Sequence, residues 1–130
     1  MNLLKIVLPM IFTLLLLATP NLFAADDSAS ASTKTMAEIM IGLHHFPSDA
    51  DKDKLRNVIA DDASTTQEKT IAHALLNLKH AITDADKRKL EIITKDTTAP
   101  AAVKSLASIL VTLNHQPSEA DTAALKQITK

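Results

Sequence analysis

Three histidines recur at a constant separation of 35 residues: His45, His80 and His115. Imidazole nitrogens bind Zn²⁺ and Cu²⁺, and imidazole changes its charge near neutral pH. His44, directly before His45, would supply a further ligand. The pattern has two interpretations, a metal site and a structural role at the ends of helices. The choice depends on how the surrounding elements place the three imidazoles.

The separation of 35 residues is a property of the whole sequence after the first 25 residues. Eight positions are identical in all three copies, and no gap is needed to align them. The copies cover 26–60, 61–95 and 96–130. Such self-similarity is typical of repeat proteins, in which each repeat is one supersecondary unit. We therefore predict a single repeat domain over 33–130, preceded by a polar, flexible segment over 25–32.

The pattern of each repeat predicts two helices joined by a short loop. Apolar residues such as Ile71, Leu75 and Leu78 recur at helical spacing in the first half of a repeat. Ser48, Thr83 and Ser118 each precede an aspartate by three residues, which predicts an N-cap at the start of every second helix. The expected helices cover 33–45, 49–60, 66–79, 84–95, 100–114 and 119–129.

The predicted fold class is all-α: three tandem 35-residue helical hairpins, stacked as a short α-solenoid or as a compact six-helix array. Sustained alternation of apolar and polar residues is missing, and the chain has one glycine, which argues against strands. One hairpin cannot bury its apolar face alone, whereas three stacked hairpins can.

The repeats resemble HEAT-like α-helical repeats when the helix pairs are taken as 49–79 and 84–114. The matching residues of the last copy are Asp96, Val103-Lys104, Ala107, Leu110 and Leu113. Asp61, Lys69, Ala72, Leu75 and Leu78 repeat the pattern. Glu68 and Thr33 stand where that family has valine, and lysine replaces its usual arginine. The resemblance implies a helical scaffold that binds another protein.

The first 24 residues indicate a bacterial-type signal peptide. Lys5 is their only charged residue, and an apolar stretch from Ile6 to Ala18 follows it. The segment then ends in small residues, so we expect cleavage after Ala24 or Ala25. The predicted location is the periplasm or the exterior of the cell, with no stable membrane insertion after cleavage.

Composition excludes several classes of function. The chain has no cysteine, tryptophan or tyrosine, which removes disulfides, thiolate metal sites and thiol catalysis. Its formal net charge of −1 makes nucleic acid an improbable partner. Every repeated serine or threonine next to an aspartate is explained as a helix cap, so we predict no enzymatic activity. No cofactor is predicted.

The expected stacking argues against one metal ion shared by the three histidines. If neighbouring hairpins are stacked in a row at about 9 Å, the outer two histidines are roughly 18 Å apart. We therefore expect each histidine to close its helix by binding the last carbonyls, with metal binding as the alternative role.

The function predicted from the sequence is that of an exported adaptor or accessory factor that binds an unidentified protein. The alternative is a periplasmic metal-binding protein that uses His45, His80 and His115. A third possibility is a structural or stress-related protein without a fixed partner.

Overall fold

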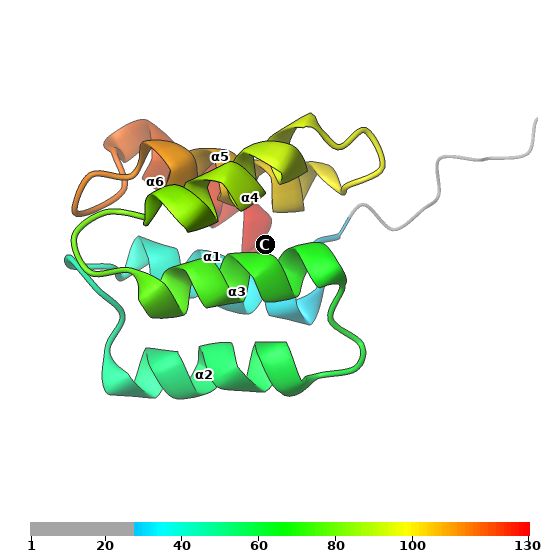
Figure 1. Ribbon diagram of the computed structural model, residues 1–130, viewed down its shortest axis with the longest axis horizontal. Coiled ribbons are helices and arrows are strands. Elements are labelled where there is room, and N and C mark those ends of the chain that lie inside the picture. Colours follow the sequence, from blue (N-terminus) through cyan, green and yellow to red (C-terminus); the bar gives the residue numbers. More distant parts are fainter. Residues whose placement is uncertain (1–27) are drawn as a thin grey trace, which may run out of the picture.

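Six helices follow one another along residues 28–130, the part of the chain that the computed structural model describes (Figure 1). They are α1 (Ala31–Ile41), α2 (Asp49–Ala60), α3 (Thr66–Asn77), α4 (Asp84–Lys95), α5 (Ala101–Thr112) and α6 (Glu119–Ile128). All six expected helices are confirmed, and these residues form no strand. The predicted signal peptide, 1–24, lies outside the described residues. None of the described helices has the length and apolar character needed to cross a membrane.

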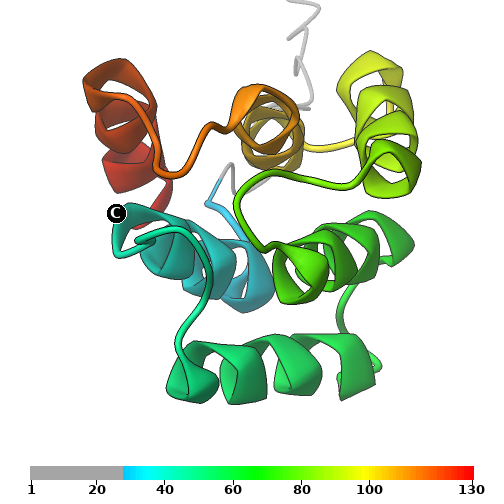
Figure 2. The same ribbon diagram turned by 60° about the vertical axis from the view of Figure 1, so that its left-hand side comes forward.

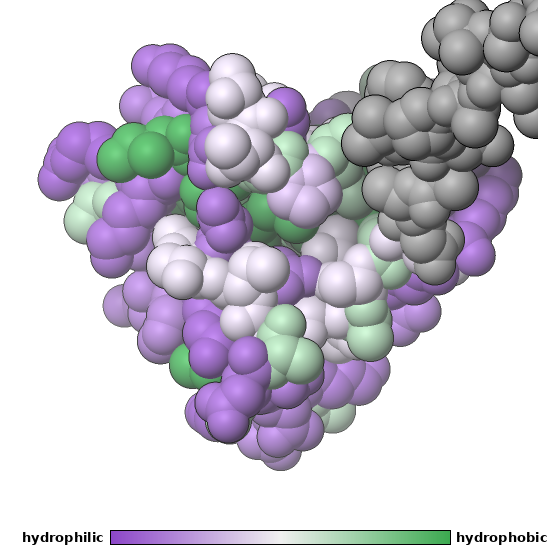
Figure 3. Space-filling model, turned by 90° about the vertical axis from the view of Figure 1, so that its right-hand side faces the viewer, coloured by the Kyte–Doolittle hydropathy of each residue, from purple (hydrophilic) through white to green (hydrophobic). Residues whose placement is uncertain are grey.

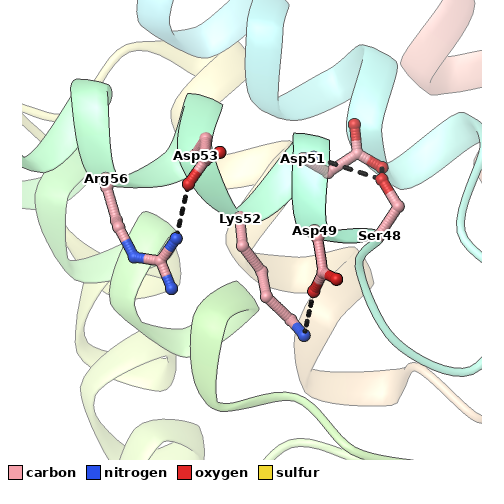
Figure 4. A network of polar contacts seen from close by, with 6 residues as sticks. All are labelled: Ser48, Asp49, Asp51, Lys52, Asp53 and Arg56. Carbon is pink, nitrogen blue, oxygen red and sulfur yellow. Dashed lines mark hydrogen bonds and ion pairs between the residues drawn. The ribbon is translucent and has the colours of Figure 1, made fainter.

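The second helix of each repeat starts at the predicted hydroxyl cap. The Ser48 side chain accepts a hydrogen bond from the Asp51 backbone N–H and donates one to Oδ2 of Asp51 (Figure 4). Thr83 and Ser118 make the equivalent bonds in α4 and α6. Acidic residues in the first turn also suit the positive end of a helix dipole. The caps fix where each loop ends and each second helix begins.

The observed helices differ from the expected ones mainly at the start of α1 and at the ends of α1, α3 and α5. α1 begins at Ala31, inside the segment 25–32 that was expected to be flexible, because the Ser30 side chain caps its N-terminus by accepting from the Thr33 N–H at 3.0 Å. At their other ends α1, α3 and α5 stop before the histidines. His45, His80 and His115 therefore lie in loops, and the expectation that each histidine ends its helix is wrong.

The helices form a closed array with approximate threefold symmetry. The most extensive contacts join the second helix of one repeat to the first helix of the next: α2 to α3, α4 to α5, and α6 to α1. The first helices α1, α3 and α5 also contact one another in all three pairs. Figure 2 shows α2, α4 and α6 placed around these three central helices.

Contact between α6 and α1 distinguishes between the two arrangements that were expected. In an open α-solenoid, the first and last repeats do not meet, and each leaves one apolar face uncovered. Here the last repeat covers the first, so both faces are removed from water. Burial of apolar surface favours this closure, and the fold is the compact six-helix array.

Equivalent apolar residues of the three repeats build the core along the central helices. The residues at these positions are Met36, Ile71 and Leu106; Met40, Leu75 and Leu110; and, from the outer helices, Leu55, Leu90 and Leu125. Each of the nine has no exposed surface. Full burial of one such side chain contributes about 1.5–3 kcal/mol, so the stability of the array rests on these repeated positions.

A buried carboxylate breaks the repetition at the end of the central helices opposite the histidines. Glu68 is 2% exposed, and the equivalent positions hold Thr33 and Val103. Ser30 Oγ and Thr33 Oγ1 of α1 both donate to Oε1 of Glu68, the latter at 2.7 Å. The Thr65 backbone N–H donates to Oε2 at 2.7 Å, which completes the predicted capping box. We call these four residues the Glu68 cluster.

The Glu68 cluster fastens the first repeat to the second. Its carboxylate belongs to α3, whereas two of its donors belong to the start of α1. Hydrogen bonds to a charged acceptor are stronger than neutral ones, and this end of the array gains a specific link between repeats. Figure 3 shows this end of the molecule, where near-neutral residues lie at the centre, hydrophilic residues lie along much of the outline, and hydrophobic residues lie above the centre.

We expect the Glu68 cluster to make stability fall in acid. Burial raises the pKa of Glu68, but hydrogen bonds from Ser30, Thr65 and Thr33 outweigh it and hold the pKa below the ordinary 4.5. A group whose pKa is lowered by folding adds stability above its unfolded pKa and loses it as pH falls through the folded pKa. The free energy of unfolding, measured by urea denaturation, should therefore decrease below about pH 4.5.

The Glu68→Gln variant is the comparison for this acid effect, since glutamine does not titrate. Its stability should change less between pH 6 and pH 3 than that of the wild type. The variant should still lose some stability in acid because of Asp86. Burial raises the pKa of Asp86, but hydrogen bonds from Asn77 and Thr83 and the charge of Lys89 lower it overall. If the free energy of unfolding of the variant depends on pH as strongly as that of the wild type, Glu68 does not contribute to the acid effect.

Candidate metal centre

The closed array brings the three first-helix loops together at one end of the molecule. α1, α3 and α5 run towards this end side by side, and each is followed by the loop that carries its histidine. Figure 2 turns this end towards the viewer and shows the three loops converging. The equivalent positions 45, 80 and 115 therefore surround the approximate symmetry axis.

His45, His80 and His115 form a compact histidine cluster. The centroids of their imidazoles are 5.7 Å apart for His45 and His80, 5.1 Å for His45 and His115, and 5.6 Å for His80 and His115. One nitrogen from each lies within 4.8 Å of the other two. All three side chains are exposed.

These distances correct the expectation of roughly 18 Å between the outer histidines. That expectation assumed repeats displaced along a line, which separates equivalent residues further at each step. The repeats are instead related by rotation about a common axis, so equivalent residues near the axis meet. One ion can thus be shared by all three imidazoles, which the linear arrangement excluded.

The backbone holds two of the histidines in a conformation that is rare for residues with a side chain. His45 and His115 have φ of 70° and 68°, and they are the only non-glycine residues of the described chain with positive φ. The Phe46 N–H donates to the His44 carbonyl at 2.9 Å, and the Gln116 N–H to the Asn114 carbonyl at 2.8 Å. His45 and His115 are thus the central residues of two γ-turns. A γ-turn whose central residue has positive φ is strained.

Backbone hydrogen bonds also connect the three loops to one another. The His45 N–H donates to the His115 carbonyl at 3.0 Å, and the His115 N–H donates to the His80 carbonyl at 3.3 Å. Strained residues persist where the surroundings fix them, and they concentrate at functional sites. Backbone hydrogen bonds therefore hold the loops of the histidine cluster in place, although its imidazoles face solvent.

The second repeat lacks the γ-turn. Pro47 and Pro117 follow two residues after His45 and His115, whereas Ile82 occupies that place after His80. A residue before proline is restricted to extended conformations, which limits the paths open to these two loops. His80 has no positive φ. It is the histidine whose replacement disturbs the backbone least.

Asn114 contacts the imidazole of His115. Its Oδ1 lies 2.6 Å from Nδ1 of His115, a hydrogen bond in which the imidazole is the donor because the amide oxygen only accepts. With the proton on Nδ1, the Nε2 lone pair is free for a metal. Such partners of ligating histidines fix the tautomer and the orientation of the imidazole.

Replacing Asn114 by alanine should weaken metal binding by about tenfold, since a partner of this kind contributes 10- to 100-fold. Asn114→Asp should keep the affinity, because a carboxylate also accepts from Nδ1–H. Calorimetric titration with Zn²⁺ measures the affinity, and ¹⁵N shifts of His115 in the metal-free protein report the tautomer. Equal affinity in the alanine variant would contradict the role.

The donor spacing fits one transition-metal ion after a small movement. A Zn–N distance of about 2.0–2.1 Å with tetrahedral angles separates two nitrogens by about 3.3 Å. The three nitrogens lie within 4.8 Å of one another, so each side chain must turn inwards slightly. Because the side chains are exposed, this rotation meets no packed core. Imidazole nitrogens suit Zn²⁺, Cu²⁺ and Ni²⁺.

Acidic residues follow each histidine loop, at the start of the next helix. Each second helix begins at this end and carries two acidic residues in its first turn: Asp49 and Asp51, Asp84 and Asp86, Glu119 and Asp121. None of these carboxylates belongs to the group of ligand atoms that the three histidines form. Three of the six already pair with lysines of the same helix: Asp49 with Lys52, Asp51 with Lys54, and Asp86 with Lys89.

The remaining histidines lie outside this group. His44 is exposed beside His45, but its imidazole is not among the three clustered ones, so its suggested role as an extra ligand has no support here. His73 is exposed on α3. The contribution of Asn114 was missed from the sequence, because the equivalent positions hold His44 and Lys79 and show no common pattern.

No family model, curated protein or solved structure matches this chain. A function for the histidine cluster therefore rests on its geometry and chemistry alone.

Proposed function

We propose that this protein binds one divalent transition-metal ion, Zn²⁺ or Cu²⁺, through the imidazoles of His45, His80 and His115. One observation carries the proposal: a nitrogen from each of the three histidines lies within 4.8 Å of the other two, although the residues are 35 positions apart in the sequence. The strained backbone at two of them supports it.

The bound ion is exchangeable. Structural zinc sites have four protein ligands and are closed, whereas three histidines leave a coordination position open. The hydrophobic core of the described residues is built from apolar side chains of all three repeats, whereas the three histidines are exposed at the surface. The proposed role is accordingly reversible binding or buffering of the metal in the exported compartment that the leader predicts, and it involves no catalysis.

Titration of the purified protein with Zn²⁺ and Cu²⁺ tests this proposal. We expect one ion per chain and a dissociation constant below about 10 µM, which corresponds to more than about 7 kcal/mol of binding free energy. The variant with His45, His80 and His115 all replaced by alanine should not bind in this range. Binding that survives in the triple variant would remove the cluster as the site.

A variant with both His44 and His73 replaced by alanine is the matched control. These two histidines are exposed, as the cluster is, but they lie outside it. The control should bind metal as the wild type does. A loss of affinity in the control would assign the binding to scattered surface histidines instead.

Binding of another protein, as expected from the repeat architecture, is the second candidate. Ile92 on α4 is 70% exposed beside a hollow of about 280 Å³ that also involves Thr66 and Lys89. A contiguous apolar patch marks an interface, and one exposed isoleucine is smaller than such a patch. For this reason the histidine cluster, and not α4, carries the proposed function.

A further inference from the structure

A groove adjoins the histidine cluster at His80. It has a volume of about 500 Å³ and runs from His80 between the end of α3 and the loop before α2; Phe46, Leu76 and Lys79 line it. We call it the Phe46 groove. Because His80 is both a wall of this groove and a member of the cluster, a ligand in the groove can reach an ion held by the three histidines.

The Phe46 groove combines an apolar wall with a cation. Phe46 is 55% exposed, one of two large apolar side chains of the described chain that solvent reaches to this extent. Leu76 is partly buried and packs against the core. Lys79 is exposed and takes part in none of the ion pairs of residues 28–130, which involve Lys52, Lys54, Arg56 and Lys89.

Lys52 also lines the groove but is already paired. Its Nζ lies 3.2 Å from Oδ1 of Asp49, as Figure 4 shows, and 6.0 Å from the centroid of the Phe46 side chain. Asp49 therefore offsets the charge of Lys52. Lys79 is the cation that remains for a ligand.

The equivalent places in the other two repeats lack this combination. Position 46 corresponds to Ala81 and Gln116, and position 79 corresponds to His44 and Asn114. The core positions are alike in all three repeats, so the difference is confined to the surface beside the cluster. Only the groove between the first and second repeats offers an aromatic wall next to a lysine.

The charge of the ion determines what completes its coordination. Three neutral imidazoles leave both positive charges of a divalent ion uncompensated, and no carboxylate of the described chain belongs to the cluster. An open position on such an ion takes water or an anion. A carboxylate satisfies the ion and also pairs with a neighbouring ammonium group.

Building on the proposed metal binding, we infer that the loaded protein binds a small organic carboxylate with an apolar body. One carboxylate oxygen occupies the open position of the ion, and the other accepts a hydrogen bond from Lys79. The apolar body lies over Phe46 and Leu76 in the groove. Aromatic and aliphatic walls with a few placed polar groups are typical of small-molecule sites.

Calorimetric titration with phenylacetate and acetate tests this inference on Zn²⁺-loaded and metal-free protein. We expect phenylacetate to bind the loaded protein about tenfold more tightly than acetate does, since it alone fills the groove. We expect its binding to the metal-free protein to be weaker by about tenfold or more. Equal binding to both forms of the protein would overturn the inference.

Variants of the groove separate this inference from the proposed metal binding. Lys79→Ala and Phe46→Ala should each weaken phenylacetate binding about fivefold or more and leave the Zn²⁺ affinity unchanged. Lys87→Ala, at the place in the second repeat that corresponds to Lys52, is the control and should change neither. Unaltered phenylacetate binding in Lys79→Ala and Phe46→Ala contradicts the inference. Absence of Zn²⁺ binding in the wild type contradicts the proposed function first, and the inference with it.

Discussion

Replacing His80 by alanine is expected to lower the Zn²⁺ affinity by about 100-fold, because two of three ligands remain and a ligand contributes at least as much as a second-shell partner. His80 gives the clearest test of the cluster. Its φ is not positive, and its loop lacks the proline that follows His45 and His115. The loss should appear as a higher dissociation constant in calorimetry, with the unfolding temperature of the metal-free protein unchanged.

The two remaining histidines provide a stricter comparison. His45→Asn and His115→Asn remove a ligand but keep a residue that tolerates positive φ better than most others. Each should lose as much affinity as His80→Ala. His73→Ala, on the exposed side of α3, should bind like the wild type. Wild-type affinity in all three cluster variants would show that the imidazoles do not share an ion.

The second large effect is expected at the opposite end of the array. Glu68→Ala should reduce the free energy of unfolding by about 3 kcal/mol, because hydrogen bonds to a charged group contribute about 1.5–3 kcal/mol and the buried Thr33 hydroxyl loses its acceptor. Ser30, Thr33 and the Thr65 N–H are the donors left without Glu68. Urea denaturation at pH 7, followed by circular dichroism, measures the change.

Glu38→Ala is the control for this stability effect. Glu38 lies on α1 and is exposed, so its loss should change the free energy of unfolding by less than about 0.5 kcal/mol. The Glu68 variant should also loosen the first repeat before the second. Hydrogen exchange should therefore be faster at the start of α1 than in α4. Equal stability of the two variants would refute the role of the Glu68 cluster.

Local signals in the sequence are sufficient to locate the helices. The hydroxyl caps at Ser48, Thr83 and Ser118 act within one turn of the chain, so their effect does not depend on the arrangement of the repeats. The sequence predicts ends for α1, α3 and α5 that lie beyond the observed last helical residues. The apolar pattern continues to Leu43, Leu78 and Leu113, which are buried beyond the last helical residue.

The arrangement of the repeats could not be obtained in the same way. An identical pattern in three copies is compatible with displacement along a line and with rotation about an axis, since both bury the same helix faces. The two differ in whether α6 covers α1, a contact between residues far apart in the chain. Whether the three histidines meet depends on which of the two arrangements forms. The sequence therefore identifies them as candidate ligands but predicts a distance between them that is too long.

One departure from the repeat pattern did carry structural information. Glu68 and Thr33 occupy a position where the HEAT-like pattern has valine, and they form a hydrogen bond with each other at 2.7 Å. The two sites meet because they lie at the starts of α1 and α3, which pack against each other.

Because the array is closed, each repeat contacts both of the others, whichever repeats are adjacent in the sequence. Every first helix packs on the second helix of another repeat, and Ser28 and Lys130 line the same hollow where the last repeat meets the first. Three separate copies of one hairpin would make equivalent helix contacts as a homotrimer, with one histidine from each copy around its symmetry axis. Fusion into one chain removes the entropic cost of association. Fusion also allows each copy to carry different residues, such as Phe46 in the first repeat and Lys79 in the second.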